Sequence, residues 1–468
     1  MKIKIQNLGP IHEFEIDLSK NFTMLFGKNN IGKSCATSVV YLIVKSFLKE
    51  KNIHKTISSL FHKSTLDISD QIDCIQNLIE NSDDKKKNIA EPVQNIIKQI
   101  INVFLLEDIQ ASFYATFEEF ENLNNRFSDE KANITITTGL IELSVNVKDD
   151  FFVINHFSLL RSVNFIYSKG KKEQNVLTDD GESLSLFKRD NANTVSAVYD
   201  LAAKIMDRIY KEITDISDNI YYFPASRSGL YQSLNSYSPI FAELARNRAF
   251  LNKKFEIPSI PEPVIDYFLT LSNIKKRKSS GNCSFVEIVK EIEESILQGE
   301  IIFDDNTKKI LFKPYNTNLE LDMFQTSSMV SEIAPLVSFI KYIIAFSNKK
   351  NKSKSLLFIE EPEAHLHPEI QVKLMAIFAK LTKNDIKIIL TTHSNYMFNK
   401  INNLILDKQI VISDICAMVF EYSDKGSTAR KIPTDDFGID DENFLDVTEN
   451  LFNEKLELID KMNRINHD

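Results

Sequence analysis

The sequence has few cysteines, no long apolar run and no excess of positive charge. Its four cysteines are scattered, at Cys35, Cys74, Cys283 and Cys416. None forms a Cys-x-x-Cys pair, which excludes a disulfide framework or zinc knuckle and implies a reducing compartment. No apolar run approaches the roughly 20 residues of a membrane-spanning helix, and the first residues lack the apolar core of a signal peptide. We therefore expect a cytoplasmic protein.

The net charge gives little reason to expect a polyanionic partner. The formal net charge is −9, which gives no global electrostatic reason to bind nucleic acid or an anionic membrane. Local basic runs leave nucleic acid possible. There is no internal repeat and no heptad run long enough for an extended coiled coil. With 43% hydrophobic residues, the 468-residue chain can bury a sizeable core.

The N-terminal part is predicted to be rich in strands. Residues 2–6 and 13–18 alternate polar and apolar side chains, which predicts two short strands. The apolar segment 22–26 predicts a third strand. A tight loop follows it, and apolar residues at helical spacing predict a helix over 36–47.

The C-terminal part is predicted to alternate strands and helices. Continuous apolar segments predict strands at 356–359, 386–390 and 410–420. A helix is predicted over 369–381, between the first two. Continuous apolar strands separated by helices indicate a mostly parallel sheet covered on both faces, so the predicted fold class is α/β.

A phosphate-binding loop motif, G-x-x-x-x-G-K-[ST], lies between the third strand and the first helix. It consists of Gly27, Lys28, Asn29, Asn30, Ile31, Gly32, Lys33 and Ser34, with Cys35 directly after it. The glycines let backbone N–H groups close around phosphate oxygens, and the helix N-terminus adds the positive end of its dipole. We expect Lys33 to reach the β- and γ-phosphates of ATP, and Ser34 to offer its hydroxyl to Mg²⁺.

Two adjacent carboxylates and one histidine follow apolar strands. Glu360 and Glu361 come directly after the strand at 356–359, at the strand end where open α/β sheets bind ligands. One carboxylate can hold a hydrated Mg²⁺ while the next polarises the attacking water. His393 follows the strand at 386–390; such a histidine alone is more often structural than functional.

Together these motifs resemble those of ABC-type ATPase heads of the overcoming-lysogenization-defect (OLD), RecF and SMC superfamily, and look closest to small ATPases of bacterial anti-phage systems. The matching segments are NLGPIHEFEIDL, GKNNIGKS, YFPASRSGL, TSSMVSEIAPL, LLFIEEPEAHLHP and TTHS. The resemblance implies that Glu360 is the magnesium-associated acid and Glu361 the general base. It also implies that His393 is the switch histidine that hydrogen-bonds the γ-phosphate.

The resemblance assigns residues 326–331 to the ABC signature. The segment departs from LSGGQ because it contains no glycine, but Ser327, Ser328 and Ser331 remain. Their hydroxyls suit N-capping of a helix and donation to a phosphate, and Ser328 is the candidate for nucleotide contact. Such heads usually close two nucleotides between two subunits, so we expect an ATP-dependent homodimer or higher oligomer.

Two further segments have alternative interpretations. Arg227, in the turn after a strand at 220–223, either belongs to the nucleotide site or forms a surface salt bridge. The resemblance puts Glu363–His367 near the dimer interface. A metal site of Glu363, His365 and His367 is the less favoured alternative, because the spacing is poor and Pro368 suits the first position of a helix.

The expected architecture is an ABC-type P-loop NTPase head with an N-terminal antiparallel β lobe and helical insertions. The predicted division is an ATPase core from 1–50 and 301–440, a helical insertion at 51–110, a β-rich lobe with core segments at 111–230, a mostly helical insertion at 231–300 and a C-terminal helix at 441–468.

The expected function is that of an ATP-hydrolysing sensor or scaffold in anti-phage defence. Too few residues follow His393 for the TOPRIM nuclease domain that many relatives carry, so we expect a separate effector such as a nuclease. The alternative is a RecF- or SMC-like ATPase that clamps DNA during repair or recombination. ATP-dependent DNA binding with a strong salt dependence would favour that alternative.

Overall fold

The computed structural model describes residues 1–49, 69–80, 86–128, 130–148, 151–160, 163–166, 173–178, 183–187, 194–233, 260–275, 283–347, 353–436, 438–440 and 452–459.

One eleven-stranded sheet runs through the centre of the molecule, in the order β11-β15-β16-β3-β17-β18-β2-β1-β5-β6-β7. Its parallel part consists of β11 (Asn219–Phe223), β15 (Ser355–Glu360), β16 (Ile386–Thr392), β3 (Phe22–Gly27) and β17 (Ile415–Ser423). The sheet continues through β18 (Gly426–Lys431), β2 (Ile11–Asp17), β1 (Lys2–Leu8), β5 (Asn133–Thr137), β6 (Ile141–Lys148) and β7 (Phe151–Leu159).

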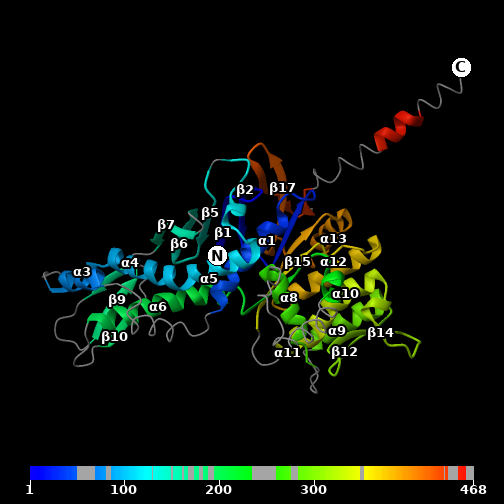
Figure 1. The fold of residues 1–468 in the computed structure, drawn as a ribbon, viewed down its shortest axis with the longest axis horizontal. Coiled ribbons are helices and arrows are strands. Elements are labelled where there is room, and N and C mark those ends of the chain that lie inside the picture. The colour runs from blue at the N-terminus through cyan, green and yellow to red at the C-terminus, as the bar shows by residue number, and fades with distance from the viewer. Residues whose placement is uncertain are drawn as a thin grey trace, which may run out of the picture.

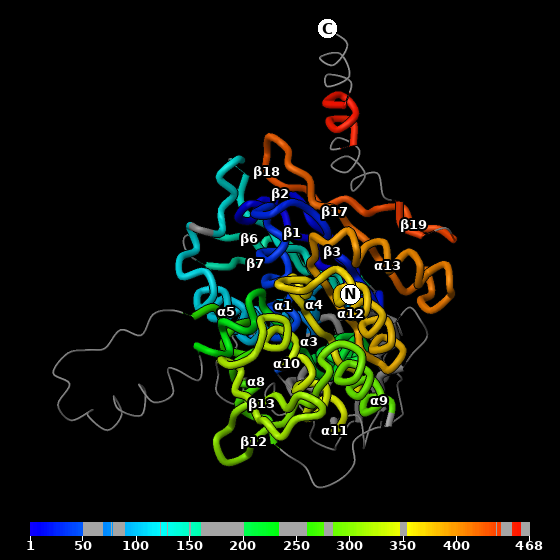
Figure 2. Tube along the Cα trace, turned by 90° about the vertical axis from the view of Figure 1, so that its right-hand side faces the viewer, coloured from blue at the N-terminus to red at the C-terminus, as the bar shows by residue number. Residues whose placement is uncertain are grey.

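Strand β3, from the N-terminal part, lies between two strands from the C-terminal part. Figure 2 shows it in blue beside the orange β17, with which it pairs in parallel. The strands beyond β17 pair antiparallel, except that β18 runs parallel to β2. The α/β fold with a parallel core and antiparallel strands is therefore confirmed. The antiparallel strands from β2 to β7 continue the same sheet, while a separate four-stranded antiparallel sheet consists of β10 (Ser183–Phe187), β9 (Glu173–Thr178), β8 (Val163–Ile166) and β4 (Lys86–Asn88).

Both faces of the parallel part are apolar. In β3, Leu25 belongs to a hydrophobic core on one face, together with helix α1 (Lys33–Leu48). Phe22, Met24 and Phe26 belong to a second core, together with helices that cover the other face. Those helices include α10 (Ser328–Phe339), α12 (Pro368–Thr382) and α13 (Asn395–Leu406). Because successive side chains of a strand point to opposite faces, burial on both explains the continuous apolar runs.

The remaining elements lie on two sides of this centre (Figure 1). On the left are α3 (Ser69–Glu80), β4 (Lys86–Asn88), α4 (Ala90–Ile101), η1 (Asn102–Leu106), α5 (Glu107–Phe117), η2 (Phe120–Leu123), β8 (Val163–Ile166), β9 (Glu173–Thr178), β10 (Ser183–Phe187) and α6 (Thr194–Thr214). On the right are α8 (Glu262–Ser272), α9 (Cys283–Ile292), η4 (Glu293–Leu297), β12 (Gly299–Asp304), β13 (Lys309–Pro314), β14 (Leu321–Asp322), η5 (Met323–Gln325), η6 (Ile340–Ile344) and α11 (Ala345–Ser347). Near the C-terminus are η7 (Ile412–Asp414), β19 (Thr434–Asp435) and β20 (Gly438–Ile439).

Some predicted boundaries were wrong, and one group of strands was not predicted. The strand expected over 410–420 begins at Ile415, because its ladder with β3 begins where Ile415 pairs with Phe22. The sheet of β12, β13 and β14 had no counterpart among the predictions. Of the predicted C-terminal helix, residues 452–459 are helical, and the rest of the range lies outside the described residues. No helix in the described part of the chain is long and apolar enough to cross a membrane.

Candidate functional site

The strand order brings the separate motifs to one edge of the sheet. Strands β3, β16 and β15 are parallel neighbours, so the segments that follow their C-terminal ends lie side by side. The phosphate-binding loop follows β3, His393 follows β16, and the Glu360–Glu361 pair ends β15. The predicted site residues thus gather where open α/β sheets bind ligands.

Two glycines are required by the geometry of the loop. Gly27 has φ +144° and Gly32 has φ +97°, both in the region that side chains rarely adopt. A Cβ at Gly32 would lie 2.9 Å from Cγ of Pro10, and one at Gly27 would lie 3.0 Å from the carbonyl oxygen of Phe420. The loop is therefore packed closely against neighbouring backbone, while Asn29 and Asn30 are exposed.

Lys33 is held inside the loop. Its Nζ donates to the carbonyl oxygens of Gly27 at 2.9 Å and Lys28 at 2.8 Å, and the residue is only 5% exposed. Burial lowers the pKa of Lys33 to about 8, against the opposing effect of nearby Glu361, Glu363 and Glu360, in decreasing order. The ammonium is thus partly desolvated, and an anionic phosphate would stabilise its charged form. Ser34, the next residue, is exposed at the start of α1.

Glu360 joins the loop helix to the segment after β11. Its Oε1 accepts from the hydroxyl of Thr37 at 3.2 Å, and its Oε2 accepts from the backbone N–H of Ala225 at 3.3 Å. The hydroxyl of Tyr222 lies 3.2 Å from that of Thr37, and burial followed by the Glu360 charge raises the pKa of this phenol. Tyr222 is therefore a neutral neighbour of the carboxylate.

The residues present fit a bound Mg²⁺. The Ser34 hydroxyl and the Glu360 carboxylate are hard oxygen ligands, and Mg²⁺ usually takes only one or two such groups beside water and phosphate oxygens. A carboxylate has about four lone-pair sites, so the donors at Glu360, which are Thr37, Ala225 and Tyr222, leave capacity for metal-bound water. The magnesium assignment stays a prediction.

Glu361 and His393 contact each other directly. Oε1 of Glu361 lies 3.2 Å from Nε2 of His393. This hydrogen bond is the main cause of a lowered pKa of Glu361, which keeps the carboxylate ionised as a general base requires. Glu361 also has φ +41°, an uncommon backbone conformation for a side-chain-bearing residue, and its N–H donates to the carbonyl of Thr391 at 3.0 Å.

Glu363 positions His393 through its backbone N–H, a role that the sequence did not show. Its Oε1 accepts from the backbone N–H of His393 at 2.6 Å and from the Thr392 hydroxyl at 2.8 Å. The metal interpretation of the neighbouring histidines gains no support, because the described residues contain no group of three metal-ligating side chains. Instead, His367 caps α12 by accepting from the N–H of Glu369 at 3.4 Å, and Pro368 opens the helix as expected.

The predicted signature segment begins a helix, as its serines indicated. Ser327 caps α10 by accepting from the N–H of Val330 at 3.4 Å, and Ser328 is the exposed first residue of that helix. Pro335 lies inside the helix. Contact of Ser328 with a nucleotide stays a prediction.

Arg227 forms a salt bridge, but not at the surface. Its guanidinium lies 3.4 Å from the carboxylate of Glu332, and the two residues are 3% and 1% exposed. The surface alternative is therefore wrong, because both charges are buried between segments of the core. Direct contact of Arg227 with a nucleotide stays a prediction. Glu332 is the single charged residue in the mostly apolar segment 329–337, which was the sequence signal for a buried charge there.

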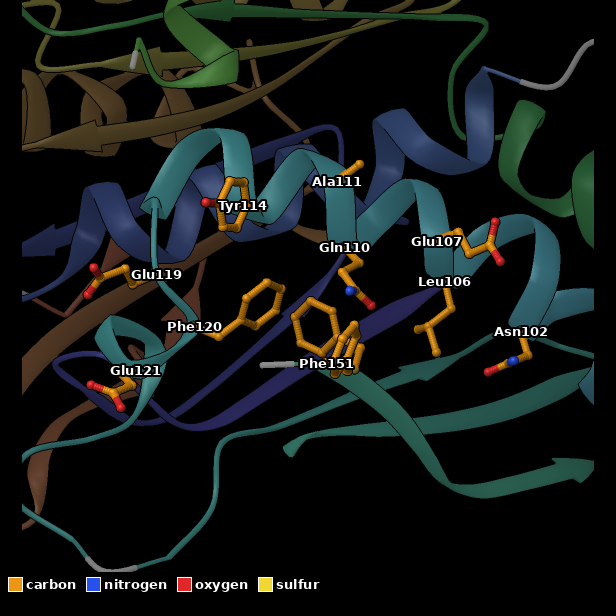
Figure 3. A pocket seen from close by; sticks show the side chains of 11 residues that line it. Asn102, Leu106, Glu107, Gln110, Ala111, Tyr114, Glu119, Phe120, Glu121 and Phe151 are labelled. Carbon is orange, nitrogen blue, oxygen red and sulfur yellow. The ribbon is translucent and has the colours of Figure 1, made fainter. Parts of the chain in front are cut away.

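A large pocket lies elsewhere in the described part of the chain. It has a volume of about 1000 Å³ and lies between α5 and β7 (Figure 3). Tyr114, Phe120 and Phe151 line it together with three glutamates. None of the predicted site residues lines it, so this pocket does not belong to the phosphate-binding edge.

The α/β fold and the phosphate-binding loop motif together define a P-loop ATPase, an enzyme that hydrolyses ATP. In agreement, residues 1–398 match the family described as AAA ATPase domain, and the chain belongs to that family.

The chain is also similar, at low scores, to three solved structures. One is the SMC head bound to the C-winged helix domain of ScpA, with 12% identity over 92% of this chain and 96% of that chain and a TM-score of 0.35. The second is the SMC head domain from Thermotoga maritima, with 10% identity over 92% and 98% and a TM-score of 0.33. The third is an Smc head domain with an extended coiled coil, bound to the C-terminal domain of ScpA derived from Pyrococcus furiosus, with 13% identity over 97% and 98% and a TM-score of 0.34. No curated protein matches the sequence.

Proposed function

We propose that the convergent residues hydrolyse Mg·ATP to ADP and phosphate. The observation that carries this proposal is the meeting of Lys33, the Glu360–Glu361 pair and His393 at one sheet edge. Backbone N–H groups of the loop and Lys33 bind the β- and γ-phosphates, while Ser34 and Glu360 hold the hydrated Mg²⁺.

In this proposal, Glu361 supplies the base. Its ionised carboxylate accepts a proton from water as the water oxygen forms a bond with the γ-phosphorus and the bond to the β–γ bridging oxygen breaks. His393, which already contacts Glu361, hydrogen-bonds the γ-phosphate and couples its presence to the base. Removal of the γ-phosphate therefore changes the partners of both side chains.

We further propose that two copies of the chain close around two nucleotides. One side of each phosphate-binding loop is exposed at Asn29, Asn30 and Ser34, and the N-terminus of α10 is exposed at Ser327 and Ser328. In a two-fold pair, the helix N-terminus of one copy can meet the phosphates held by the other. ATP would then stabilise the pair by binding to both copies.

A mixing experiment tests this arrangement. Lys33→Ala removes the phosphate contact of one copy, and Ser328→Arg blocks the helix end that meets the partner's phosphates. Each variant alone should be inactive. In an equal mixture, half of the pairs contain both variants and one intact site of two, so ATP-dependent pairing should return, together with about one quarter of wild-type hydrolysis if the two sites act independently.

The matched control is Ser413→Arg, at an exposed serine just before β17, at the opposite end of the strands. This variant should be active without mixing. If ATP induces no pairing in the mixture, measured by sedimentation, the shared-site arrangement is wrong.

At the level of the cell, we propose a cytoplasmic sensor or scaffold ATPase of anti-phage defence that controls a separate effector such as a nuclease. The motif resemblance to ATPases of such systems supports the role, and the net charge of −9 favours a protein partner over DNA. Binding of the purified chain to duplex DNA, with and without ATP and across a salt series, distinguishes the possibilities. ATP-dependent DNA affinity with a steep salt slope would replace this role by a DNA clamp.

A further inference from the structure

A buried ion pair between Arg227 and Glu332 connects the start of α10 to the main chain of Glu360 and Glu361. The side chains of Arg227 and Glu332 are 4% and 0% exposed, and Nη2 lies 3.4 Å from Oε2. Arg227 belongs to the segment after β11, and Glu332 lies four residues after Ser328 on α10. The pair thus joins two segments that are far apart in the sequence.

Arg227 also holds the main chain at the end of β15. Its Nη1 donates to the carbonyl oxygen of Glu360 at 2.7 Å and to that of Pro224 at 3.2 Å. Its Nη2 donates to the carbonyl oxygen of Glu361 at 3.4 Å. The planar guanidinium presents several donors in fixed directions, so it fixes these carbonyl groups relative to one another.

Glu332 fixes α10 to the same place. Its Oε1 accepts from the hydroxyl of Ser228 at 2.6 Å and from the N–H of Ser228 at 3.3 Å. Its own carbonyl oxygen accepts from Nε of Arg227 at 3.5 Å. Separating two buried charges leaves each uncompensated, so the start of α10 and the end of β15 are expected to move together.

The conformation of Glu361 makes this connection relevant to hydrolysis. A residue with a side chain keeps an uncommon positive φ, here +41°, only where the surroundings hold it. Its N–H donates to the carbonyl and hydroxyl oxygens of Thr391, and its own carbonyl accepts from the N–H of Ala364 at 3.1 Å and from Arg227 at 3.4 Å. Arg227 is therefore one of the groups that hold the main chain from which the Glu361 carboxylate projects, and it also contacts α10 through Glu332.

We propose that the Arg227–Glu332 pair transmits the position of the α10 N-terminus to Glu361. Contact of Ser328 with the partner's phosphates would then set the base in its own copy, which couples the two hydrolysis sites. This inference rests on the two-copy arrangement proposed above. Arg227 and Glu332 act as positioning residues, because they touch the main chain of the base and not the reacting atoms.

Two conservative variants test the coupling. Arg227→Lys keeps the charge but loses the planar set of donors, and Glu332→Gln keeps the shape but loses the charge. We expect ATP affinity within about twofold of wild type and a kcat lowered on the order of 10²-fold, because small misplacement of a catalytic group has effects of that size. The Hill coefficient for ATP in hydrolysis should fall from above 1 to 1, because the sites no longer communicate.

The matched control is Glu293→Gln. Glu293 is 7% exposed and pairs with Lys341 at 3.0 Å, which links η4 to η6, and it accepts from the N–H of Ile301; these contacts lie away from the phosphate-binding edge. It should lower Tm much as Glu332→Gln does, but leave kcat and the Hill coefficient unchanged.

A double variant separates positioning from stability. Replacing both charges, in Arg227→Met with Glu332→Leu, should recover Tm relative to the single variants because no unpaired charge remains buried. The coupling proposal requires that kcat and the Hill coefficient stay low. If kcat instead follows Tm through the whole series, the pair only stabilises the fold and the proposal is overturned.

Failure of the coupling can be distinguished from failure of the two-copy arrangement. ATP-dependent pairing of Lys33→Ala with Ser328→Arg, measured by sedimentation, addresses the arrangement alone. If the pair forms but Arg227→Lys retains normal kcat and cooperativity, only the coupling is wrong. In the mixed pair the copy with the intact site carries Ser328→Arg, so the coupling also predicts hydrolysis well below the value for independent sites. If no pair forms, the arrangement fails and the coupling fails with it.

Discussion

ATP affinity should decrease as the pH rises through about 8, because of the environment of Lys33. Burial lowers the pKa of its ammonium to about 8 in the free protein, although Glu360, Glu361 and Glu363 act in the opposite direction. A bound triphosphate favours the charged form, so binding restores the proton wherever the free protein has lost it. The affinity is therefore nearly full well below pH 8 and decreases progressively as the pH rises through that value.

The size of the effect follows from the protonated fraction. With a pKa of about 8, roughly nine-tenths of the protein carries the Lys33 charge at pH 7 and roughly one-tenth at pH 9. Since the apparent Kd scales inversely with the competent fraction, it should rise about tenfold between these values.

Calorimetric titration with Mg·ATP from pH 7 to pH 9 measures this slope. In Lys33→Arg the charge persists over the whole range, so any remaining pH dependence belongs to other groups. The reasoning about Lys33 would be refuted by a constant Kd in the wild-type protein, or by an equal slope in Lys33→Arg.

Three other substitutions have defined outcomes. Lys33→Ala should abolish hydrolysis in a phosphate-release assay, and residual activity above one-tenth of wild type would contradict its role. Gly32→Ala should cost about 1–3 kcal/mol of unfolding free energy in a denaturant titration, because φ is +97° and the new Cβ meets Pro10 at 2.9 Å; an unchanged midpoint would show that the loop adapts. His393→Ala should move the acid limb of the pH–kcat profile to higher pH, because the His393 hydrogen bond is the main cause of the lowered Glu361 pKa; an unmoved limb would mean that another group titrates there.

The chemistry of the site could be predicted because its parts are local. The phosphate-binding loop is a contiguous motif between a strand and a helix, and Glu360 and Glu361 directly follow an apolar strand. Parallel strands have their C-terminal ends at one edge, so the meeting of these segments followed from the predicted sheet. The exact neighbours of β3 were fixed only by the three-dimensional strand order.

The supporting contacts could not be predicted, because they join residues without a common sequence pattern. Arg227 pairs with Glu332 across 105 positions in the sequence, and Glu360 meets the hydroxyl of Thr37 across 323. Thr37 lies one helical turn after Lys33, a position from which it can face the same edge, but nothing local identified its partner. A surface salt bridge was one of the two interpretations of Arg227, and the sequence could not show its burial because the packing of α10 against β11 depends on the whole core.

The central claim is that Glu361 acts as the base on ATP held by Lys33, and a single substitution tests it most directly. Glu361→Gln keeps the size and hydrogen-bonding shape of the side chain but cannot accept a proton from water. In single-turnover experiments with saturating Mg·ATP, we predict wild-type ATP binding and hydrolysis slowed by about 10²-fold or more. Hydrolysis at the wild-type rate with normal binding would contradict the claim.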